Sequence, residues 1–338
     1  MDLTAAVDEC LRDGMAGGRY RGLVVGVSTS DDRVVRAAGE VQPDGLFELG
    51  SVTKVFTGLA LALAAVRGEV ALDEPVADLL PGVRVPVGWG RRPILLWHLA
   101  THLSGLPRLP VGLLWKLRGD LRDPYADVDA DWLYASLAQT RLRPWRPPGR
   151  RYRYSNLGMG LLGHALARRV TGGSDSRGED YARMVRERIC VPLGLADTVH
   201  GDGDGRIVQG HSGAGTPVPP WDLAALAGAG GLRATADDVL TFLDTQLGRA
   251  EVPGDLAAAM ALTHRVRYAG RKIRVGLAWH VDPGPGAPRT YWHDGGTGGG
   301  ASVAVFAPAH GRAVVILANQ ARSVWPLVVR LRRALDAD

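Results

Sequence analysis

A serine and a lysine three positions apart, Ser51 and Lys54, open a long apolar run of the chain. In a helix, residues at this spacing share a face, so the Lys54 amine can reach the Ser51 hydroxyl. A serine hydroxyl is a poor nucleophile until a base takes its proton, and a lysine can be that base if burial or neighbouring cations lower its pKa. A helix start also presents backbone N–H groups to developing negative charge. The pair alone is weak evidence, because surface helices contain it by chance.

A second polar group, Tyr154 to Asn156, follows a proline-rich loop and precedes another helical pattern. A tyrosine held near a lysine ammonium ionises more easily and can shuttle a proton. The amide of Asn156 offers both a donor and an acceptor, which suits the binding of a substrate carbonyl. The segment therefore supplies a candidate for proton transfer and a candidate for substrate binding.

A third group, His293, Asp294 and Gly295, ends a predicted strand and leads into a run of glycines. Glycines allow a substrate to approach the backbone closely. His293 can supply a hydrogen-bond donor or a positive charge at the wall of a site. The backbone N–H of Gly296 can complete an oxyanion hole with that of Ser51. We expect this segment to bind substrate.

Strand patterns lie at both ends of the chain, and helical patterns lie between them. Short apolar runs bounded by turn residues predict strands at 23–29, 33–38, 275–281, 290–294, 301–307 and 313–318. Helices are predicted at 3–15, 51–67, 131–140, 157–171, 180–189, 236–248 and 324–335, with Ser51 at the cap of the second. We therefore predict an α/β (α+β) fold, in which an antiparallel sheet built from both chain termini is flanked by helices. The expected sheet domain comprises residues 1–58 and 265–338, and a mainly helical domain of residues 59–264 is inserted into it.

The three polar groups, in this order, resemble the motifs of the serine β-lactamase-like superfamily. That superfamily includes class C β-lactamases, D-alanyl-D-alanine carboxypeptidases, esterases and transacylases, and related signatures combine a Ser-x-x-Lys motif with a later glycine-containing one. The similarity extends over nearly the whole chain, through segments 47–50, 68–76, 98–106, 153–156, 192–195, 230–235 and 317–319. It implies the β-lactamase/transpeptidase-like fold and chemistry through a covalent acyl-enzyme.

The resemblance also implies roles for the residues. Ser51 would be the acylated nucleophile, and Lys54 and Tyr154 would be its base and proton relay. Asn156 would bind the substrate, and Gly296 would donate the second oxyanion hydrogen bond. His293 would stand where many members of the family have lysine.

Asp294 departs from the family pattern, in which a threonine often holds this position and helps to bind a substrate carboxylate. An anion here repels a peptide C-terminus or a β-lactam carboxylate. The substitution puts β-lactamase and carboxypeptidase activity in doubt and favours neutral or cationic esters and amides.

Composition and charge limit the classes of partner. Hydrophobic residues make up 46% and charged residues 22% of the chain, which is ordinary for a globular protein. The formal charge of +5 is a mild excess with no recognisable nucleic-acid module, so no nucleic-acid partner is expected. The N-terminal residues do not resemble a signal peptide, and the longest apolar stretch is too short for a bilayer, so a cytoplasmic protein without a membrane partner is expected. The two cysteines, Cys10 and Cys190, fit no metal spacing, and we expect neither a metal nor another cofactor.

Two other patterns offer alternative chemistry. His98 and His102 are four positions apart, a spacing that can bind zinc. Leu99, however, stands where a zinc protease has its glutamate. We therefore expect these histidines to belong to the core or to support a site from behind. The segment 210–214 is a near miss to the Gly-x-Ser-x-Gly nucleophile elbow, and it leaves Ser212 as a minor alternative nucleophile.

Two further segments could border a site. The arginine-rich stretch 141–153 is expected to be a solvated loop, with an anion-attracting rim as the alternative. The aromatic and leucine residues between 111 and 132 suit either the core or an apolar substrate pocket. They include Leu113, Leu114, Trp115, Tyr125 and Trp132.

The leading functional hypothesis is a serine hydrolase that cleaves a small-molecule ester, amide or peptide-like substrate through an acyl-enzyme on Ser51. The first alternative is a transacylase that passes the acyl group to an amine or alcohol. The second belongs to another class: a sensor of β-lactams or peptides that is acylated on Ser51 and does not turn over. Release of more than one equivalent of product distinguishes an enzyme from a sensor.

Replacement of Ser51 by alanine tests the assignment of the nucleophile. We expect Ser51→Ala to abolish acyl-enzyme formation and to reduce turnover on the order of a thousandfold or more, as for other covalent nucleophiles. Intact-protein mass spectrometry and steady-state kinetics measure the two effects. Near-normal activity of Ser51→Ala would remove this mechanism and direct attention to Ser212.

Overall fold

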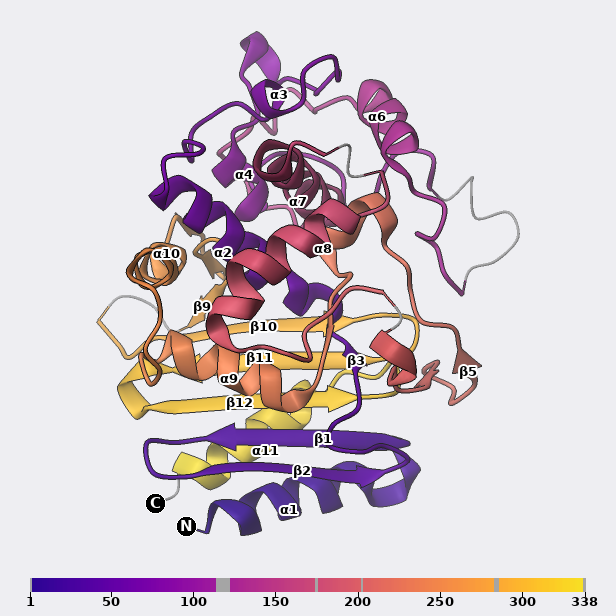
Figure 1. The fold of residues 1–338 in the computed structure, drawn as a ribbon, viewed down its shortest axis with the longest axis vertical. Coiled ribbons are helices and arrows are strands. Elements are labelled where there is room, and N and C mark those ends of the chain that lie inside the picture. The colour runs from indigo at the N-terminus through magenta and orange to yellow at the C-terminus, as the bar shows by residue number, and fades with distance from the viewer. Residues whose placement is uncertain (1, 114–121, 174–175, 202, 283–285, 337–338) are drawn as a thin grey trace.

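The computed structural model describes residues 2–113, 122–173, 176–201, 203–282 and 286–336 (Figure 1). Leu114 and Trp115, which belong to the expected apolar segment, lie outside these ranges. The termini lie close together at one end of the molecule, below the sheet in Figure 1. The helical region between them lies on the opposite side of the sheet.

An antiparallel sheet of eight strands organises the fold, in the order β2-β1-β12-β11-β10-β9-β8-β7. Its strands come from the two ends of the chain, which confirms the predicted fold class. The bounds are β1 Gly22–Ser28, β2 Arg33–Gly39, β7 Tyr268–Ala269, β8 Arg274–Val275, β9 His280–Asp282, β10 Thr290–Gly296, β11 Ala301–Ala307 and β12 Arg312–Ala318.

The single strand expected at 275–281 is in fact two short strands, β8 and β9, joined by a tight turn. The N–H of Gly276 donates to the carbonyl of Trp279 at 2.9 Å, and Ala278 has a φ of 72°. The turn places Leu277 and Trp279 in the core. An apolar run alone does not distinguish this turn from a continuous strand.

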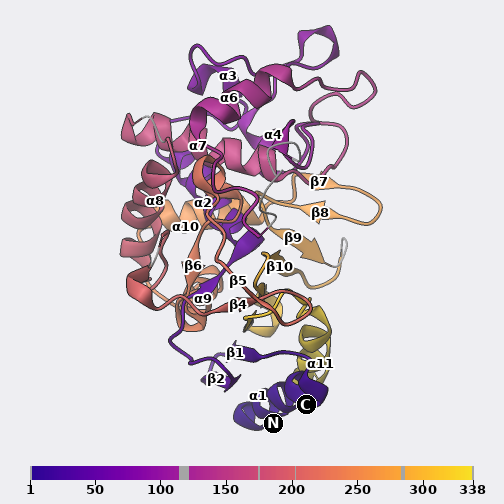
Figure 2. The same cartoon turned by 90° about the vertical axis from the view of Figure 1, so that its right-hand side faces the viewer.

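Both faces of the central strands are covered, so their sequences read as continuous apolar runs. Along β1, Leu23, Val25 and Val27 pack in one cluster with α1 (Leu3–Met15) and α11 (Trp325–Asp336). Val24 points to the other face, where α9 (Ala236–Gln246) and the helical region cover the sheet. Figure 2 shows α1 and α11 on one side of the sheet and the remaining helices on the other.

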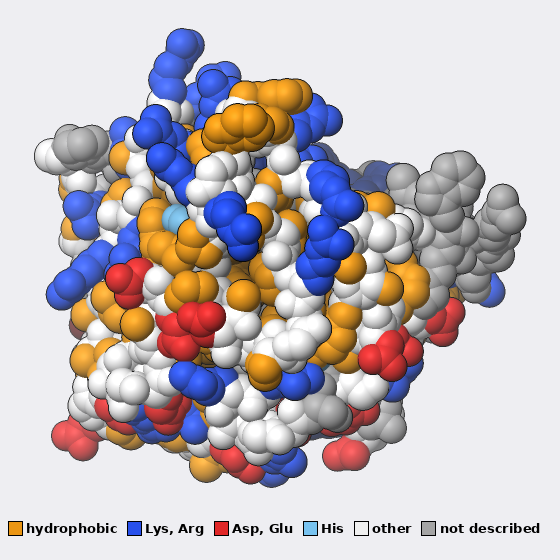
Figure 3. Space-filling view, turned by 90° about the horizontal axis from the view of Figure 1, so that it is seen from above, with side chains coloured by type: hydrophobic (Ala, Val, Ile, Leu, Met, Phe, Trp, Pro, Cys, Tyr) orange, Lys and Arg blue, Asp and Glu red, His pale blue; other side chains and the backbone are white. Residues whose placement is uncertain are grey.

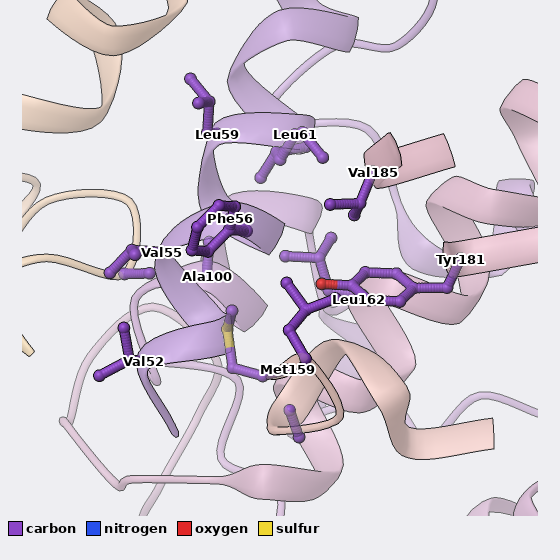
Figure 4. Packing of buried hydrophobic residues seen from close by; sticks show 14 of the residues in the cluster. Val52, Val55, Phe56, Leu59, Leu61, Ala100, Met159, Leu162, Tyr181 and Val185 are labelled. Atoms are coloured by element: carbon purple, nitrogen blue, oxygen red, sulfur yellow. The ribbon is translucent and has the colours of Figure 1, made fainter. Parts of the chain in front are cut away.

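Helix α2 (Thr53–Val66) lies at the centre of the helical region, and its first twelve residues are all buried. Figure 4 shows Val52, Phe56 and Leu61 packed among side chains of the neighbouring segments, including Met159 and Tyr181. The other described helices are α3 Val76–Leu79, α4 Leu96–Ala100, α6 Ala130–Gln139, α7 Asn156–Thr171, α8 Glu179–Val185 and α10 Gly254–His264. The predicted helices are present, and α10, rich in alanine, is one that the patterns missed.

The start of α2 differs from the prediction. Ser51 does not cap the helix; it lies inside a 3-10 turn, Gly50–Val52, and α2 begins at Thr53. Gly50 has a φ of +47°, and a Cβ there would come within 2.8 Å of the Gly296 nitrogen. The close approach of this turn to β10 requires a glycine.

Sheet and helices share one large hydrophobic cluster, which joins α2, α7 and α9 to β11 and β12. The expected division into residues 1–58 with 265–338 and residues 59–264 stays a prediction.

Helix α7 crosses the 3-10 segment Ala224–Ala229 at a pair of glycines, Gly163 and Gly228. A Cβ on Gly163 would lie 2.9 Å from the Gly228 Cα and 3.0 Å from the Tyr181 ring. Because backbone lies on one side and a buried ring on the other, neither neighbour can move without disturbing the core.

We expect Gly163→Val to lower the free energy of unfolding by roughly 2 kcal/mol or more through overpacking. Chemical denaturation measures the change. Gly254→Val is the matched control, because an added Cβ at Gly254 meets nothing within 4 Å. Equal stabilities of the two variants would contradict the packing described here.

Candidate active site

Ser51 and Lys54 meet at the wall of a cavity of about 650 Å³ between the sheet and the helical region. Lys54 is fully buried in the first turn of α2. Its Nζ lies 2.7 Å from the Ser51 Oγ and 2.5 Å from the carbonyl oxygen of Ala229, to which it donates. The predicted contact between the two side chains is therefore present, with one amine hydrogen held by the backbone.

Burial controls the protonation of Lys54. Removal of the ammonium from water lowers the pKa of this group well below its ordinary value. The nearby Arg108 guanidinium lowers the pKa further, and the Asp294 carboxylate opposes these two effects. The environment favours the neutral amine, whose lone pair can accept the proton of Ser51.

Tyr154 completes the cluster from the segment before α7. Its ring centroid lies 5.1 Å from Lys54 Nζ and 5.3 Å from the guanidinium carbon of Arg108. Burial raises the pKa of the phenol, and a hydrogen bond with Ser51 opposes the shift. The expected ease of ionisation beside an ammonium is absent, because burial also favours the neutral form of the lysine. Tyr154 is thus a neutral phenol that can donate a proton.

Asn156 is the first residue of α7 and lines the cavity. The preceding Ser155 caps the helix, because its Oγ accepts a hydrogen bond from the N–H of Gly158 at 2.9 Å. Burial raises the pKa of Tyr125, and a hydrogen bond with the Asn156 side chain opposes that shift. Among the described residues, the Asn156 Oδ1 is buried without a hydrogen-bond partner, which leaves an acceptor for a substrate N–H.

The end of β10 lies directly against the turn that carries Ser51. A Cβ on Gly295 would come within 2.2 Å of the Leu49 carbonyl oxygen and 3.0 Å of the Ser51 nitrogen. The Ser302 hydroxyl donates to the same Leu49 carbonyl at 2.7 Å and so joins β11 to this turn. Both Ser51 and Gly296 line the cavity, as an oxyanion hole formed by their N–H groups requires.

His293 and Asp294 point to opposite faces of β10, as successive strand residues do. Asp294 lines the cavity, whereas His293 is fully buried and is not among the lining residues. The His293 ring lies behind Tyr154, with the two centroids 6.3 Å apart, and its Nδ1 lies 2.7 Å from the Asp294 carbonyl oxygen. Burial lowers the pKa of His293 well below its ordinary value, so the positive charge considered for this residue is disfavoured.

Two arginines of the cavity were missed by sequence reasoning. Arg108 and Arg322 both line it, from the loop after α4 and from the loop before α11. Arg108 follows the family-like segment 98–106 by two residues, which is the one signal that could have identified it. The charge of the site is therefore mixed, because Asp294 lies in the same cavity.

Glu48 connects two residues that line the cavity, Trp221 and Thr297. Its carboxylate accepts a hydrogen bond from the Trp221 N–H at 2.7 Å and another from the Thr297 hydroxyl at 2.9 Å. The Thr297 Oγ1 in turn accepts the N–H of Gly300 at 3.0 Å. This network fixes the glycine loop that follows Gly296.

Most of the other candidate residues are not among those that line the cavity. Ser212 lies in the turn between β4 (Gly210–His211) and β5 (Pro217–Val218), where its Oγ accepts the Thr216 N–H at 3.2 Å. Trp132 is not among the lining residues, although Tyr125 is. Of the arginine-rich stretch, Arg141, Arg143, Arg150 and Arg151 are exposed, as expected for a solvated loop.

Lys and Arg side chains are spread over the end of the molecule formed by the helical region (Figure 3). Within the described part of the chain, each helix is too short or too polar to span a bilayer.

Removal of the amine and of the phenol tests whether Lys54 and Tyr154 act as one unit. We expect Lys54→Ala and Tyr154→Phe each to lower kcat/KM on the order of a hundredfold or more, and the double variant to lose far less than the product of the two factors. The reason is that both groups serve the same proton of Ser51. Multiplicative losses in the double variant would show that the two residues act independently.

Comparisons with known proteins identify the relatives of this chain. The Beta-lactamase family model matches residues 7–338. The chain is 28% identical to the D-alanyl-D-alanine-carboxypeptidase/endopeptidase AmpH of Escherichia coli, over 84% of this chain and 75% of that protein. It is 31% identical to the esterase EstB of Burkholderia gladioli, over 70% of this chain and 65% of that protein.

Solved structures agree with the sequence comparisons. A class C β-lactamase from Rhodobacter sphaeroides aligns over 99% of this chain and 98% of its own, with a TM-score of 0.78 and 27% identity. A β-lactamase from Sulfitobacter aligns over 99% of this chain and 97% of its own, with a TM-score of 0.79 and 25% identity. The chain thus has the fold, the motif order and the full-length match of serine hydrolases, and it belongs to the β-lactamase family.

Proposed function

We propose that this protein hydrolyses an ester or amide bond of a small molecule through an acyl-enzyme on Ser51. The observation that carries the proposal is the 2.7 Å contact between the Ser51 Oγ, which lines the cavity, and the buried Lys54 amine. A neutral amine in this position is a general base that needs no further activation. The names of two relatives, a D-alanyl-D-alanine-carboxypeptidase/endopeptidase and an esterase, support hydrolysis of an amide or ester bond.

In the acylation step, the Ser51 Oγ attacks the substrate carbonyl carbon while its proton passes to Lys54 Nζ. The N–H groups of Ser51 and Gly296 stabilise the oxyanion that forms. The bond to the leaving group then breaks, and Tyr154 gives its proton to the departing oxygen or nitrogen. The Lys54 ammonium returns a proton to Tyr154, so the step ends with both groups neutral and Ser51 acylated.

Deacylation follows the same path in reverse with water in place of the leaving group. Water gives a proton to the Tyr154 and Lys54 pair and attacks the acyl carbon. The second oxyanion collapses, the bond to the Ser51 Oγ breaks, and the serine recovers its proton. The products are a carboxylic acid and the unmodified enzyme.

The groups around the cavity favour particular substrates. The Oδ1 of Asn156 is an acceptor that suits an N–H near the scissile carbonyl. Asp294, beside the oxyanion position, disfavours a carboxylate at that point of the substrate. Arg108 and Arg322 line the same cavity, so a negative group elsewhere on the substrate is tolerated.

The fate of the acyl group is decided by a partition experiment. The purified protein is incubated with an activated ester and increasing amounts of an amine or alcohol, and acid and transfer product are both followed. We expect acid to form at a rate that the acceptors do not change, with many turnovers per protein. Saturable transfer product would identify a transacylase, and a single equivalent retained on Ser51 would identify a sensor. The Ser51→Ala variant gives the uncatalysed rate.

Replacement of Asp294 by threonine tests the role of its charge. We expect Asp294→Thr to increase acylation by a carboxylate-bearing ester, relative to a neutral ester, by about fivefold, since a like-charge contact in a solvated site costs about 1 kcal/mol. Asp237→Thr, which removes an exposed acid of α9 outside the cavity, is the control. An unchanged ratio in Asp294→Thr would show that its carboxylate does not face the substrate.

A further inference from the structure

His102 makes three contacts with the segment that carries Tyr154. The N–H of Arg153, before the tyrosine, donates to the carbonyl oxygen of His102 at 2.8 Å. The N–H of Ser155, after the tyrosine, donates to the His102 Nδ1 at 3.2 Å. Between these two hydrogen bonds, the rings of His102 and Tyr154 pack with centroids 4.3 Å apart. One residue therefore holds the tyrosine on both sides and across its face.

The backbone of His102 adopts an uncommon conformation to make these contacts. Its φ is +59°, in the left-handed region, where residues with a Cβ are strained. The residue is only 1% exposed, so the conformation does not serve a surface turn. The left-handed turn directs both the carbonyl and the ring of His102 to the same short segment.

The protonation state of His102 matches this role. Burial, and then the nearby Lys54, lowers the pKa of the imidazole well below its ordinary value. A neutral ring with Nδ1 as acceptor carries its hydrogen on Nε2. Protonation of Nδ1 would remove the acceptor that holds the Ser155 N–H.

We propose that His102 is a positioning residue that fixes the Tyr154 hydroxyl at the distance from Ser51 needed for proton transfer. The inference rests on the proposed function, in which Tyr154 donates the proton to the leaving group. Proton transfer requires hydrogen-bond reach, and a displacement of about 1 Å can cost on the order of a hundredfold in rate. His102 is not among the residues that line the cavity, so it acts through Tyr154, which is one of them.

Two substitutions separate the acceptor from the ring. His102→Phe keeps an aromatic face against Tyr154 and removes the acceptor for the Ser155 N–H. His102→Asn keeps an acceptor at the δ position, tolerates the left-handed backbone and removes the ring. We expect His102→Phe to lower kcat about 10- to 100-fold with little change in KM, and His102→Asn to recover at least a third of the wild-type kcat.

His98→Asn is the matched control. His98 is also a buried histidine whose Nδ1 accepts a backbone N–H, that of Leu95 at 3.1 Å, and it does not contact Tyr154. We expect His98→Asn to keep the wild-type kcat even if it lowers the melting temperature as much as His102→Phe does. A loss of kcat in His98→Asn equal to that in His102→Phe would overturn the proposal, because general loosening of the fold would then explain both.

The decisive comparison is made in a Tyr154→Phe background, where no hydroxyl remains to be positioned. There, His102→Phe should cause no further loss in the rate of single-turnover acylation. A further 10-fold loss would overturn the proposal, since His102 would then act by another route. If instead Tyr154→Phe alone kept full activity, the proposed role of Tyr154 would fail, and that result is distinct from either outcome for His102. If His102→Phe does not fold, His102→Leu, which also removes the acceptor, makes the same comparison.

Discussion

The Lys54 side chain is fully buried. Transfer of a charged ammonium from water into such a site costs far more free energy than transfer of a neutral amine. Among the described residues, the Lys54 Nζ donates to the Ala229 carbonyl, and it also lies 2.7 Å from the Ser51 hydroxyl. Burial and then Arg108 lower the pKa of this amine, and Asp294 raises it. The proposed mechanism depends on this balance, because only an uncharged lysine can take the proton of Ser51.

The rest of the fold fixes the positions of Lys54, Ser51 and Tyr154 relative to one another. Helix α2 is buried along nearly its whole length, which fixes Lys54 relative to the turn that carries Ser51. The end of β10 packs so closely on this turn that Gly50 and Gly295 cannot carry a side chain. Tyr154 depends on a third region, the loop after α4, because His102 binds the backbone on both sides of it. Three separate parts of the chain, α2 with the turn before it, β10 and the loop after α4, therefore position the groups around the Ser51 hydroxyl.

The sequence predicted what depends on local spacing. The contact of Ser51 with Lys54 follows from the pitch of a helix, and the sheet follows from apolar runs at the two ends of the chain. The prediction of one continuous strand at 275–281 was wrong, because the left-handed alanine at position 278 leaves no pattern in an apolar run. The burial of His293 was missed because the local sequence does not show which face of β10 is turned to the cavity. Which face of a strand meets the cavity is decided by packing with distant residues.

Residues that reach the site from elsewhere in the fold were also beyond sequence reasoning. Arg108 and Arg322 are separated by over two hundred positions, and nothing in the local sequence of either indicates a shared cavity. Their presence changes the interpretation of Asp294, whose repulsion of anions applies to one point of the substrate and not to the whole site. Local patterns thus predicted the contact of Ser51 with Lys54 better than the charge of the cavity around it.

The ionisation of Lys54 can be measured directly, because the chain contains only three lysines, Lys54, Lys116 and Lys272. In protein labelled with ¹⁵N-lysine, the side-chain signal of Lys54 is assigned as the one lost in Lys54→Ala, and its position is followed against pH. The account predicts a neutral amine at pH 7 that gains its proton only as the pH falls further, while the acylation rate falls with it. An ammonium at pH 7, with a titration near the ordinary lysine value of about 10.4, would contradict it.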